Sequence, residues 1–470
     1  MCGIFGAISA KPDPRLPEWV YFGLSQLQHR GQESVGVAYS DGDTVYVDKE
    51  EGLVSQVLTE SKIQDIQNHN PNIVIGHVRY STSKGTSSKN IQPQFLDTGK
   101  WDRIALVHNG NIPGLEDKKR KLSEEHIDIS SKANDTEFML RKIYYLSLKT
   151  GDLETAIQEF MKEINGSYSA ALMTKHDVFV FRDPWEDRPL FISSKDGVIF
   201  FASETCALKD YSANIVEVSA GRRVKITPVD DGFQCFVNVR EYQAVQQNIP
   251  KAHCVFEKIY FARPDSRTFS QEEEGSFRFR LGRKMANSSP VPNANLVSGI
   301  PESGRPAAQG FAFESKIPYI DTYIRNSYMP GRTFINPNPS SRAEYSRIKY
   351  HLEGWAVKDK CLVLVDDSIV RGNTMRGKVA ELFNAGAKEV HLRISSPRVI
   401  GQCFYGIDIP TREELVAFDK SEEEIRKWLG ATSLKYLPVS ALEEVLSEGG
   451  EVPQNFCKGC FTGEYPIPLE

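Results

Sequence analysis

The sequence predicts two domains, the first built from stacked sheets with helices and the second an α/β domain. With 470 residues, the chain is too long for one ordinary hydrophobic core. Short alternating or apolar runs, typical of strands, recur over residues 2–239. In the second half strands alternate with helices, and residues 361–365 form an apolar run of the kind buried on both faces of a parallel sheet. The polar segment 241–253 separates the halves, so we expect domains at 2–240 and 254–470.

Local patterns predict individual elements of both halves. Five strands are expected in the first half, at residues 72–75, 104–107, 168–173, 178–181 and 198–202. Residues 135–148 have apolar side chains at helical spacing, and Asp135 can cap this helix. Three short helices are expected to start near the C-terminus, at Thr411 with Glu414, Ser421 with Glu424 and Ser440 with Glu443, the first two as capping boxes.

Composition excludes several classes of protein. The formal net charge of −5 gives no global attraction for nucleic acid or an anionic membrane, so we expect small-molecule partners. The first twenty residues lack the pattern of a signal peptide, and no apolar run is long enough to span a bilayer. Eight cysteines are too sparse for a disulfide scaffold. These features predict a cytoplasmic enzyme.

Cys2 is the first candidate catalytic residue. Once Met1 is removed, as is usual before a small residue, Cys2 presents a thiol and a free α-amine. These groups titrate near about 8.5 and about 7.7–8.0, so the amine can serve as a base for the thiol at physiological pH. A cysteine at this position can also be incidental.

Two strand ends carry further polar groups. Residues 76–82 read GHVRYST, in which Arg79 can grip a carboxylate through its two-pronged guanidinium. A second strand ends in His108, Asn109, Gly110 and Asn111, which places a side-chain amide beside an unobstructed glycine N–H. That pair suits an oxyanion hole, although an Asn-Gly pair after a strand is also typical of a tight turn.

Seven segments, CGIFG, LQHRGQES, GHVRYST, VHNGNI, NDTE, RDPWEDRPL and ASETCAL, together resemble the N-terminal-nucleophile glutaminase domain of class II amidotransferases. The resemblance implies a four-layer αββα sandwich. It assigns Cys2 as the nucleophile, Asn109 and Gly110 as the oxyanion hole, Arg79 and Asp135 to the glutamine α-carboxylate and α-amine, and Arg30 and Thr82 to the pocket. Trp185 and Glu186 depart from the RDPHG that relatives often have, a change without a chemical explanation in the sequence.

The second half carries VLVDDSIVRGNT at residues 363–374. Here a buried strand ends in two carboxylates, and a short turn with a hydroxyl and a glycine enters a helix. Backbone N–H groups at a helix start bind phosphate, and Gly372 allows close approach. Asp366 and Asp367 can hold ribose hydroxyls or a magnesium ion. Alternatively, Asp367 only caps the helix and Asp366 is a solvated acid.

This string resembles the phosphoribosyl pyrophosphate motif of type I phosphoribosyltransferases, and VDDSIVRG is similar to its form in the amidophosphoribosyltransferase family. Supporting matches are IYFARPDS, GIPESGRPAA, RTFINP and RISSP. The resemblance implies an α/β domain whose substrate contacts are Ser303, Gly304, Arg347, Lys349, Asp366, Asp367, Ser368, Arg371, Gly372 and Thr374. It implies magnesium held by Ser303, Asp366 and Asp367, and a closing loop at residues 332–349. SRIKYHL at residues 346–352 departs from the family pattern, as do Arg305, Pro306 and Asn373.

Four cysteines are candidate metal ligands: Cys254, Cys403, Cys457 and Cys460. Only the last two form a CxxC pair, and their spacing alone favours structural zinc or unmetallated thiols. All four occupy the ligand positions of the iron–sulfur-containing branch of the family, which implies a 4Fe–4S cluster acting as a structural staple.

Together the halves imply a glutamine amidotransferase that transfers ammonia to phosphoribosyl pyrophosphate, giving phosphoribosylamine, pyrophosphate and glutamate for purine synthesis. The resemblance also implies purine nucleotide inhibitors and a homo-oligomer, tetramer or dimer. A glucosamine-phosphate synthase shares the glutaminase half, but DDSIVRGNT argues against it. The remaining alternative is a non-catalytic paralogue that senses phosphoribosyl pyrophosphate or nucleotides, as the altered residues 346–352 would allow.

Overall fold

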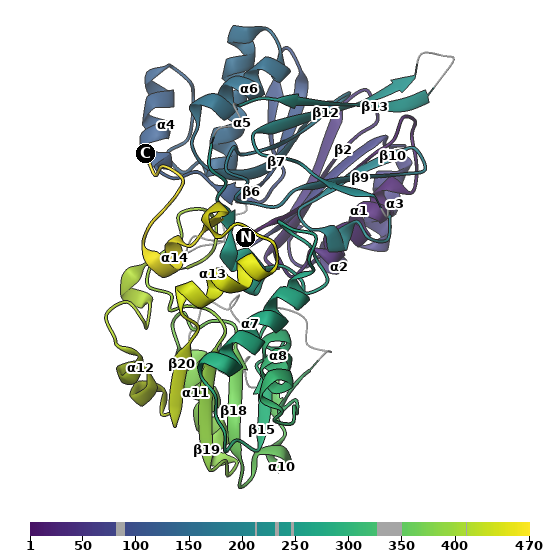
Figure 1. The fold of residues 1–470 in the computed structure, drawn as a ribbon. Coiled ribbons are helices and arrows are strands. Elements are labelled where there is room, and N and C mark those ends of the chain that lie inside the picture. The colour runs from purple at the N-terminus through teal and green to yellow at the C-terminus, as the bar shows by residue number, and fades with distance from the viewer. Residues whose placement is uncertain (81–89, 212–213, 231–234, 246–248, 327–349, 410) are drawn as a thin grey trace. The chain divides into compact units, whose positions relative to one another are not determined.

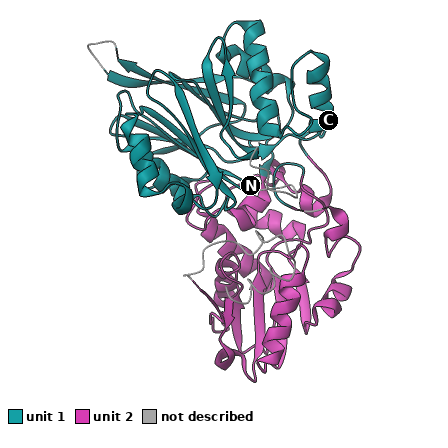
Figure 2. Cartoon of the chain, turned by 180° about the vertical axis from the view of Figure 1, so that it is seen from behind, with its two compact units in different colours: residues 1–253, 404–408, 466–470 teal, residues 254–403, 409–465 magenta. Residues whose placement is uncertain are grey.

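The computed structural model describes residues 1–80, 90–211, 214–230, 235–245, 249–326, 350–409 and 411–470 (Figure 1). These residues form two compact units, which Figure 2 distinguishes by colour. Unit 1 comprises Met1–His253, Phe404–Asp408 and Pro466–Glu470, and unit 2 comprises Cys254–Cys403 and Ile409–Tyr465. The two late segments of unit 1 have no counterpart in the sequence patterns.

Unit 1 contains two antiparallel sheets. The first has the order β11-β9-β10-β1-β4-β2-β3 and the second has the order β13-β12-β8-β7-β6-β5. The strands of the first sheet are β1 (Gly3–Ile8), β2 (Ser34–Ser40), β3 (Val45–Glu51), β4 (Ile73–Arg79), β9 (Phe191–Lys195), β10 (Val198–Ala202) and β11 (Ile215–Glu217). Those of the second are β5 (Gln94–Thr98), β6 (Asp102–Asn111), β7 (Ser167–Met173), β8 (Val178–Arg182), β12 (Arg222–Asp230) and β13 (Cys235–Gln243).

The side chains of β1 show how unit 1 is layered. Ile4 and Ile8 lie in the core between the two sheets, whereas Phe5 and Ala7 belong to the core on the helix side. Successive side chains of a strand face opposite sides, so a strand with apolar cores on both sides is apolar throughout. The first sheet is covered by α1 (Leu16–Gln26), α2 (Val54–Val57) and α3 (Glu60–Asn68), and the second by α4 (Leu115–Glu124), α5 (Asp135–Thr150) and α6 (Leu153–Glu163). The predicted αββα sandwich is confirmed.

Unit 2 is built on a parallel sheet of order β15-β18-β19-β20. Its strands are β15 (Leu296–Gly299), β18 (Cys361–Asp366), β19 (Glu389–Ile394) and β20 (Ser433–Tyr436). Four further short strands form two pairs, β14 (His253–Cys254) with β21 (Phe456–Cys457) and β16 (Tyr323–Arg325) with β17 (Tyr350–Leu352). The helices are α7 (Glu274–Ser288), α8 (Arg305–Ser315), α10 (Gly354–Val357), α11 (Asn373–Asn384), α12 (Glu422–Leu429), α13 (Val439–Glu448) and α14 (Gly459–Thr462). The predicted α/β domain is confirmed.

The five strands expected in the first half are present, and three expected helix starts need correction. The helix expected to start at Ser440 is α13, which begins at Val439 and has Pro438 as its cap. Helix α5 begins at Asp135, but its cap is Asn134, whose side chain accepts the N–H of Glu137. Ser421 forms the expected capping box with Glu424. Only a three-residue 3-10 turn follows Thr411, because the chain leaves helical geometry where Val416 N–H donates to the Val370 carbonyl. Among the described residues, no helix has the length and apolar character needed to cross a membrane.

Candidate functional site

Contacts of both the backbone and the thiol fix Cys2 at the start of β1, the middle strand of the first sheet. The Cys2 N–H donates to Asn109 Oδ1 at 3.1 Å, and the Cys2 carbonyl accepts from Arg30 Nε at 2.8 Å. Its Sγ lies 3.8 Å from the carbonyl oxygen of Tyr80. The candidate nucleophile therefore stands on a rigid, buried element.

The Asn109–Gly110 pair lies on β6, beside Cys2. Asn109 is fully buried, and its Nδ2 has no hydrogen-bond acceptor among the described residues. Leaving a buried donor unpaired costs about 1–3 kcal/mol, which indicates a place for a ligand atom. Gly110 has φ 147°, and a Cβ there would lie only 1.9 Å from the Ser167 carbonyl oxygen. Only glycine fits this position, so the pair is no ordinary tight turn.

Arg30 is fully buried and contacts the backbone of the candidate nucleophile. Besides the Cys2 carbonyl, its guanidinium contacts the carboxylate of Glu204, which is also fully buried. Glu204 Oε1 accepts in addition from His29 Nε2 at 2.7 Å. In these contacts Arg30 positions Cys2, and its predicted place in the substrate pocket stays a prediction. Thr82, the other predicted pocket residue, lies outside the described residues.

Arg79 and Asp135 are the residues predicted to hold glutamine. Arg79 ends β4, and its Nη1 lies 4.0 Å from Glu33 Oε2. Asp135 Oδ2 lies 3.8 Å from His108 Nδ1. Burial lowers the pKa of His108, and burial followed by the charge of Arg79 lowers that of His77 far below its usual range. Both imidazoles are therefore neutral at pH 7, so they add no charge beside Arg79 and Asp135.

Trp185 and Glu186, the pair that departs from the family pattern, contact residues 251–253, where the first segment of unit 1 ends. Glu186 is buried, and its Oε2 lies 2.8 Å from Lys251 Nζ and 2.7 Å from His253 Nε2. The Trp185 carbonyl accepts the N–H of Ala252 at 2.7 Å. These hydrogen bonds fasten residues 251–253, immediately before Cys254, so the departure from the family pattern has a structural role.

Asp366 and Asp367 gather at the carboxyl end of β18. Asp367 Oδ1 accepts from Ser303 Oγ at 2.6 Å and its Oδ2 accepts from Ser368 Oγ at 2.5 Å, while Asp366 Oδ1 accepts the Asp367 N–H at 2.9 Å. Burial and the neighbouring Asp367 carboxylate raise the pKa of Asp366 well above its usual range. Burial also raises the pKa of Asp367. Two carboxylates held together in this way repel each other, and a bound cation would reduce that repulsion.

Two helix starts flank this carboxylate pair. Gly304 precedes α8, and a Cβ there would lie 2.9 Å from the Val365 carbonyl oxygen, so glycine lets the two loops approach. Gly372 precedes α11 with φ 78°. Of the other predicted residues, Thr374 is exposed in the first turn of α11 and Arg371 pairs with Glu414 at 2.8 Å. Arg347 and Lys349 lie outside the described residues.

The structure groups the four predicted cluster cysteines within unit 2. Cys254 and Cys457 lie on the paired strands β14 and β21, and Cys460 lies on α14. The Cys460 carbonyl accepts from the N–H groups of Ile400 and Gly401, just before Cys403. Burial, followed by the three other thiols, raises the pKa of Cys460 well above its usual range. The four thiols are thus near enough to affect one another electrostatically.

Comparison with known proteins covers the whole chain. Residues 77–210 match the family profile of the glutamine amidotransferase domain. The chain is 39% identical to an amidophosphoribosyltransferase of Methanocaldococcus jannaschii, covering 100% of this chain and 98% of the relative, and 38% identical to one of Synechococcus elongatus, covering 100% and 92%. The chain belongs to the amidophosphoribosyltransferase family. It also matches a solved glutamine phosphoribosylpyrophosphate amidotransferase of B. subtilis in complex with ADP and GMP, with a TM-score of 0.87 and 36% identity over 100% of this chain and 98% of that one.

Two parts of the candidate glutaminase site had not been assigned from the sequence. Glu204 lies within ASETCAL, so the motif held the signal although no residue of it was assigned a role. The segment Phe404–Asp408 carried no such signal. A Cβ on its Gly406 would lie 2.9 Å from the Gly110 backbone, and Tyr80 Oη donates to Asp408 Oδ2 at 3.4 Å. This late segment therefore packs directly against the candidate oxyanion residue.

Proposed function

We propose that this enzyme hydrolyses glutamine at Cys2 and transfers the ammonia to phosphoribosyl pyrophosphate, giving 5-phosphoribosylamine, pyrophosphate and glutamate. Full-length similarity to amidophosphoribosyltransferases supports the overall reaction. The observation that carries the assignment of the site is the Asn109 amide. Its oxygen holds the Cys2 N–H, while its nitrogen remains a buried donor without a protein acceptor among the described residues.

The first half-reaction begins with the Cys2 thiol. Met1 is buried, and burial lowers the pKa of its terminal amine to about 5, with Arg188 and Arg30 adding to the effect. Removal of Met1 moves the chain terminus to Cys2, whose new α-amine lies on the same residue as the thiol. That amine takes the thiol proton, and the thiolate attacks the glutamine side-chain carbonyl. The same amine then returns the proton to the leaving ammonia, which leaves a thioester between Cys2 and the glutamyl group. Water attacks this thioester, which releases glutamate and returns a proton to the Cys2 sulfur.

The oxyanion that forms in this attack is bound by Asn109 Nδ2 and the Gly110 N–H. Donors already in place at the position of developing charge lower the barrier without reorganisation. Arg79 and Asp135 hold the α-carboxylate and α-amine of glutamine through opposite charges. Thr82 completes the pocket, as the family resemblance implies.

The second half-reaction takes place at the end of β18. Asp366 and Asp367 bind the ribose hydroxyls, and the loop from Ser368 to Thr374 binds the 5-phosphate at the start of α11. Ser303 and Gly304, at the start of α8, bind the pyrophosphate, with Arg371, Arg347 and Lys349 as further contacts. The donor set fits magnesium, because it combines carboxylate and hydroxyl oxygens with excess negative charge. Bound magnesium would neutralise charge on the departing pyrophosphate.

The four cysteines fit an iron–sulfur cluster better than a single zinc. Four thiolates around one zinc lie about 3.8 Å apart, from Zn–S bonds of about 2.3 Å in a tetrahedron. No three of the sulfur atoms of Cys254, Cys403, Cys457 and Cys460 come within 4.8 Å of one another. A 4Fe–4S cluster places several atoms between its ligands. We expect about four irons per chain in anaerobically purified protein, lost together in Cys457→Ser. Stoichiometric zinc that is lost in Cys457→Ser, in protein without iron, would overturn this assignment.

Regulation and location follow from the family as further parts of the proposal. The B. subtilis relative was solved in complex with ADP and GMP, and we propose that purine nucleotides bind and inhibit this enzyme. We place the enzyme in the cytoplasm as a homo-oligomer, a dimer or a tetramer.

One experiment tests the coupled reaction. Purified protein is incubated with glutamine, magnesium and phosphoribosyl pyrophosphate, and glutamate and pyrophosphate are measured together. We expect equal amounts of both products. Absence of both, with substrates still bound, would favour the non-catalytic sensor predicted from the altered residues 346–352.

A further inference from the structure

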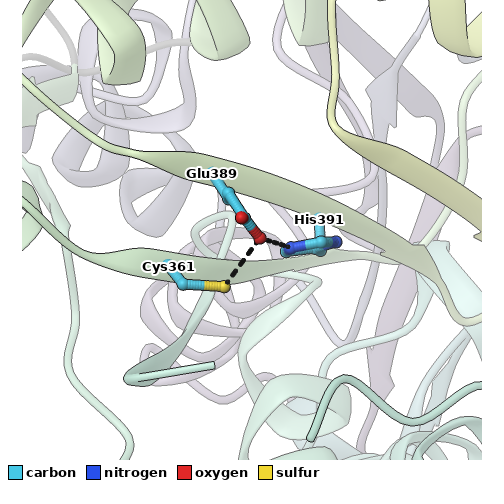
Figure 3. Close-up of side chains that lie close together, drawn as sticks. All are labelled: Cys361, Glu389 and His391. Carbon is cyan, nitrogen blue, oxygen red and sulfur yellow. Dashed lines mark hydrogen bonds and ion pairs between the residues drawn. The ribbon is translucent and has the colours of Figure 1, made fainter. Parts of the chain in front are cut away.

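Three side chains with different metal-binding chemistry meet at the amino-terminal edge of the parallel sheet (Figure 3). Cys361 begins β18, and Glu389 and His391 lie at the start of β19. Glu389 Oε2 lies 3.4 Å from Cys361 Sγ and 2.8 Å from His391 Nε2. One ligand atom from each residue lies within 4.8 Å of both others.

This edge is distinct from the candidate phosphoribosyl site. Asp366 is the last residue of β18 and Cys361 is the first. Five residue steps along a parallel strand separate the two ends by about 16 Å. A ligand at Cys361 therefore has no direct contact with groups at Asp366.

We propose that Cys361, Glu389 and His391 bind one divalent transition-metal ion of the zinc class, with water or an external ligand in the fourth position. Thiolate, carboxylate and imidazole are the side chains that bind zinc, and three protein ligands leave one position open. One thiolate and one carboxylate also balance the two positive charges of the ion. A bound site is therefore neutral, which limits the cost of partial burial.

Strand pairing prepares the arrangement without an ion. Cys361 is directly opposite Glu389 in the parallel register, and His391 lies two residues further along β19, so it shares a face with Glu389. The other ring nitrogen, His391 Nδ1, lies 2.8 Å from Ser433 Oγ on β20, and this hydroxyl also accepts from Arg393 Nη1 at 3.0 Å. A second hydrogen bond of this kind fixes the ring orientation of metal-binding histidines.

The two distances from Glu389 Oε2 to the other ligand atoms can be compared with those of a tetrahedral site. Zinc bonds of the usual lengths place sulfur and oxygen ligands about 3.6 Å apart, and nitrogen and oxygen ligands about 3.4 Å apart. The observed 3.4 Å from Cys361 Sγ to Glu389 Oε2 already fits, and the 2.8 Å from His391 Nε2 requires a small outward rotation of Glu389. That rotation is accessible because the Glu389 side chain is 50% exposed.

Without an ion, the same residues form a hydrogen-bonded trio. Burial, followed by the hydrogen bond to Glu389, raises the pKa of the Cys361 thiol to about 11, so the sulfur carries its proton at pH 7. Metal binding releases this thiol proton to solvent. The ion then joins the starts of β18 and β19. It stabilises unit 2 in proportion to the logarithm of the metal concentration above Kd.

The test compares zinc binding by the full chain and matched variants. Each protein, with the iron it contains when purified, is equilibrated with zinc, desalted, and assayed for zinc and iron by mass spectrometry. We expect the wild type to retain one more zinc per chain than Cys361→Ser or His391→Gln, with unchanged iron. Glu389→Gln should weaken this binding by more than about tenfold.

Cys235→Ser is the control, because Cys235 is an exposed thiol on β13 of unit 1. It should retain zinc as the wild type does. Cobalt provides an independent measurement, since a thiolate-to-cobalt absorption band should be present in the wild type and absent from Cys361→Ser. Equal zinc in the wild type, Cys361→Ser and His391→Gln would overturn the proposal, as would a cobalt band that persists in Cys361→Ser.

Discussion

The two candidate reaction sites differ in how their charges are balanced. Around Cys2, the buried guanidinium of Arg30 is paired with the buried carboxylate of Glu204, and Asn109 Nδ2 is left available as a donor. At the end of β18, Asp366 and Asp367 crowd two carboxylates together, and both pKa values are raised. The buried charges of the first site are paired before its substrate binds. The negative charges of the second site are neutralised only when a cation binds. The transferase activity and the stability of unit 2 should therefore both depend on metal.

The largest expected effect comes from Cys2→Ala, which removes the nucleophile from the balanced site. Glutamine-dependent synthesis should fall by more than about a thousandfold, because the thiol forms the covalent intermediate. Synthesis from free ammonia should persist, since Cys2 serves only the first half-reaction. Assaying both nitrogen donors on one preparation separates these outcomes. Continued glutamine use would eliminate Cys2 as the nucleophile.

Asn109→Asp tests the available donor. Aspartate keeps the oxygen that accepts the Cys2 N–H and replaces the Nδ2 donor, so the position of Cys2 is preserved. Loss of one oxyanion donor lowers kcat by about 100- to 1000-fold. Glutaminase kinetics should show this loss while the rate of thiol alkylation at Cys2 stays within a fewfold of the wild type. Normal kcat in this variant would show that Asn109 does not bind the oxyanion.

Asp366→Asn tests the unbalanced site and should have opposite effects on activity and stability. The pKa of Asp366 is raised in the folded protein, so this carboxyl lowers stability as the pH rises above its unfolded-state pKa of about 3.9. The neutral amide of the variant removes this cost. Without metal at pH 8, Tm should therefore rise by roughly 2–4 °C. Magnesium should stabilise the wild type more than the variant. Use of phosphoribosyl pyrophosphate should weaken, and basal glutamine hydrolysis should remain. A lower Tm in metal-free buffer would contradict the proposed charge crowding.

The smallest expected effect concerns Glu186, which belongs to neither reaction site. Its carboxylate charge is already paired with Lys251 and His253. Glu186→Gln should lower stability at pH 7 by about 1–3 kcal/mol, since it weakens the bonds to Lys251 and His253. Those partners hold the pKa of Glu186 below its usual range despite burial. A carboxyl whose pKa is lowered in the folded state stabilises the protein at pH values above its unfolded-state pKa. The difference in unfolding free energy between the variant and the wild type should therefore shrink as the pH falls from about 5 towards about 2. Urea unfolding at several pH values measures it.

Sequence patterns predicted the fold well where local periodicity and burial agree. Strand β18 is apolar from Cys361 to Val365 because both of its faces are covered, and the sequence shows that directly. The cap of α5 was misassigned by one residue because Asn134 and Asp135 are both good capping residues. Thr411 failed as a helix start because the pairing of Val416 with Val370, distant in sequence, decides the local geometry.

The candidate sites were predicted unevenly for the same reason. Ser303, Asp366, Asp367 and Ser368 come together as expected, since each lies at a strand end or a helix start of one parallel sheet. Tertiary placement of Glu204 and Phe404–Asp408 against Cys2 and Gly110 depends on contacts across long stretches of chain. No local pattern encodes such contacts. The trio of Cys361, Glu389 and His391 was missed because the strand register, unknown from the sequence, brings it together.

The late return of the chain to unit 1 has a consequence during synthesis on the ribosome. Arg188 is fully buried against Asp187, and its guanidinium also donates to the carbonyl of Tyr405, 217 residues later. At translation rates of about 5–20 residues per second, that carbonyl is made roughly 10–45 s after Arg188. The hydroxyl of Tyr405 in turn donates to Ile467, almost at the end of the chain. The first unit therefore cannot complete these hydrogen bonds until nearly the whole polypeptide has been synthesised.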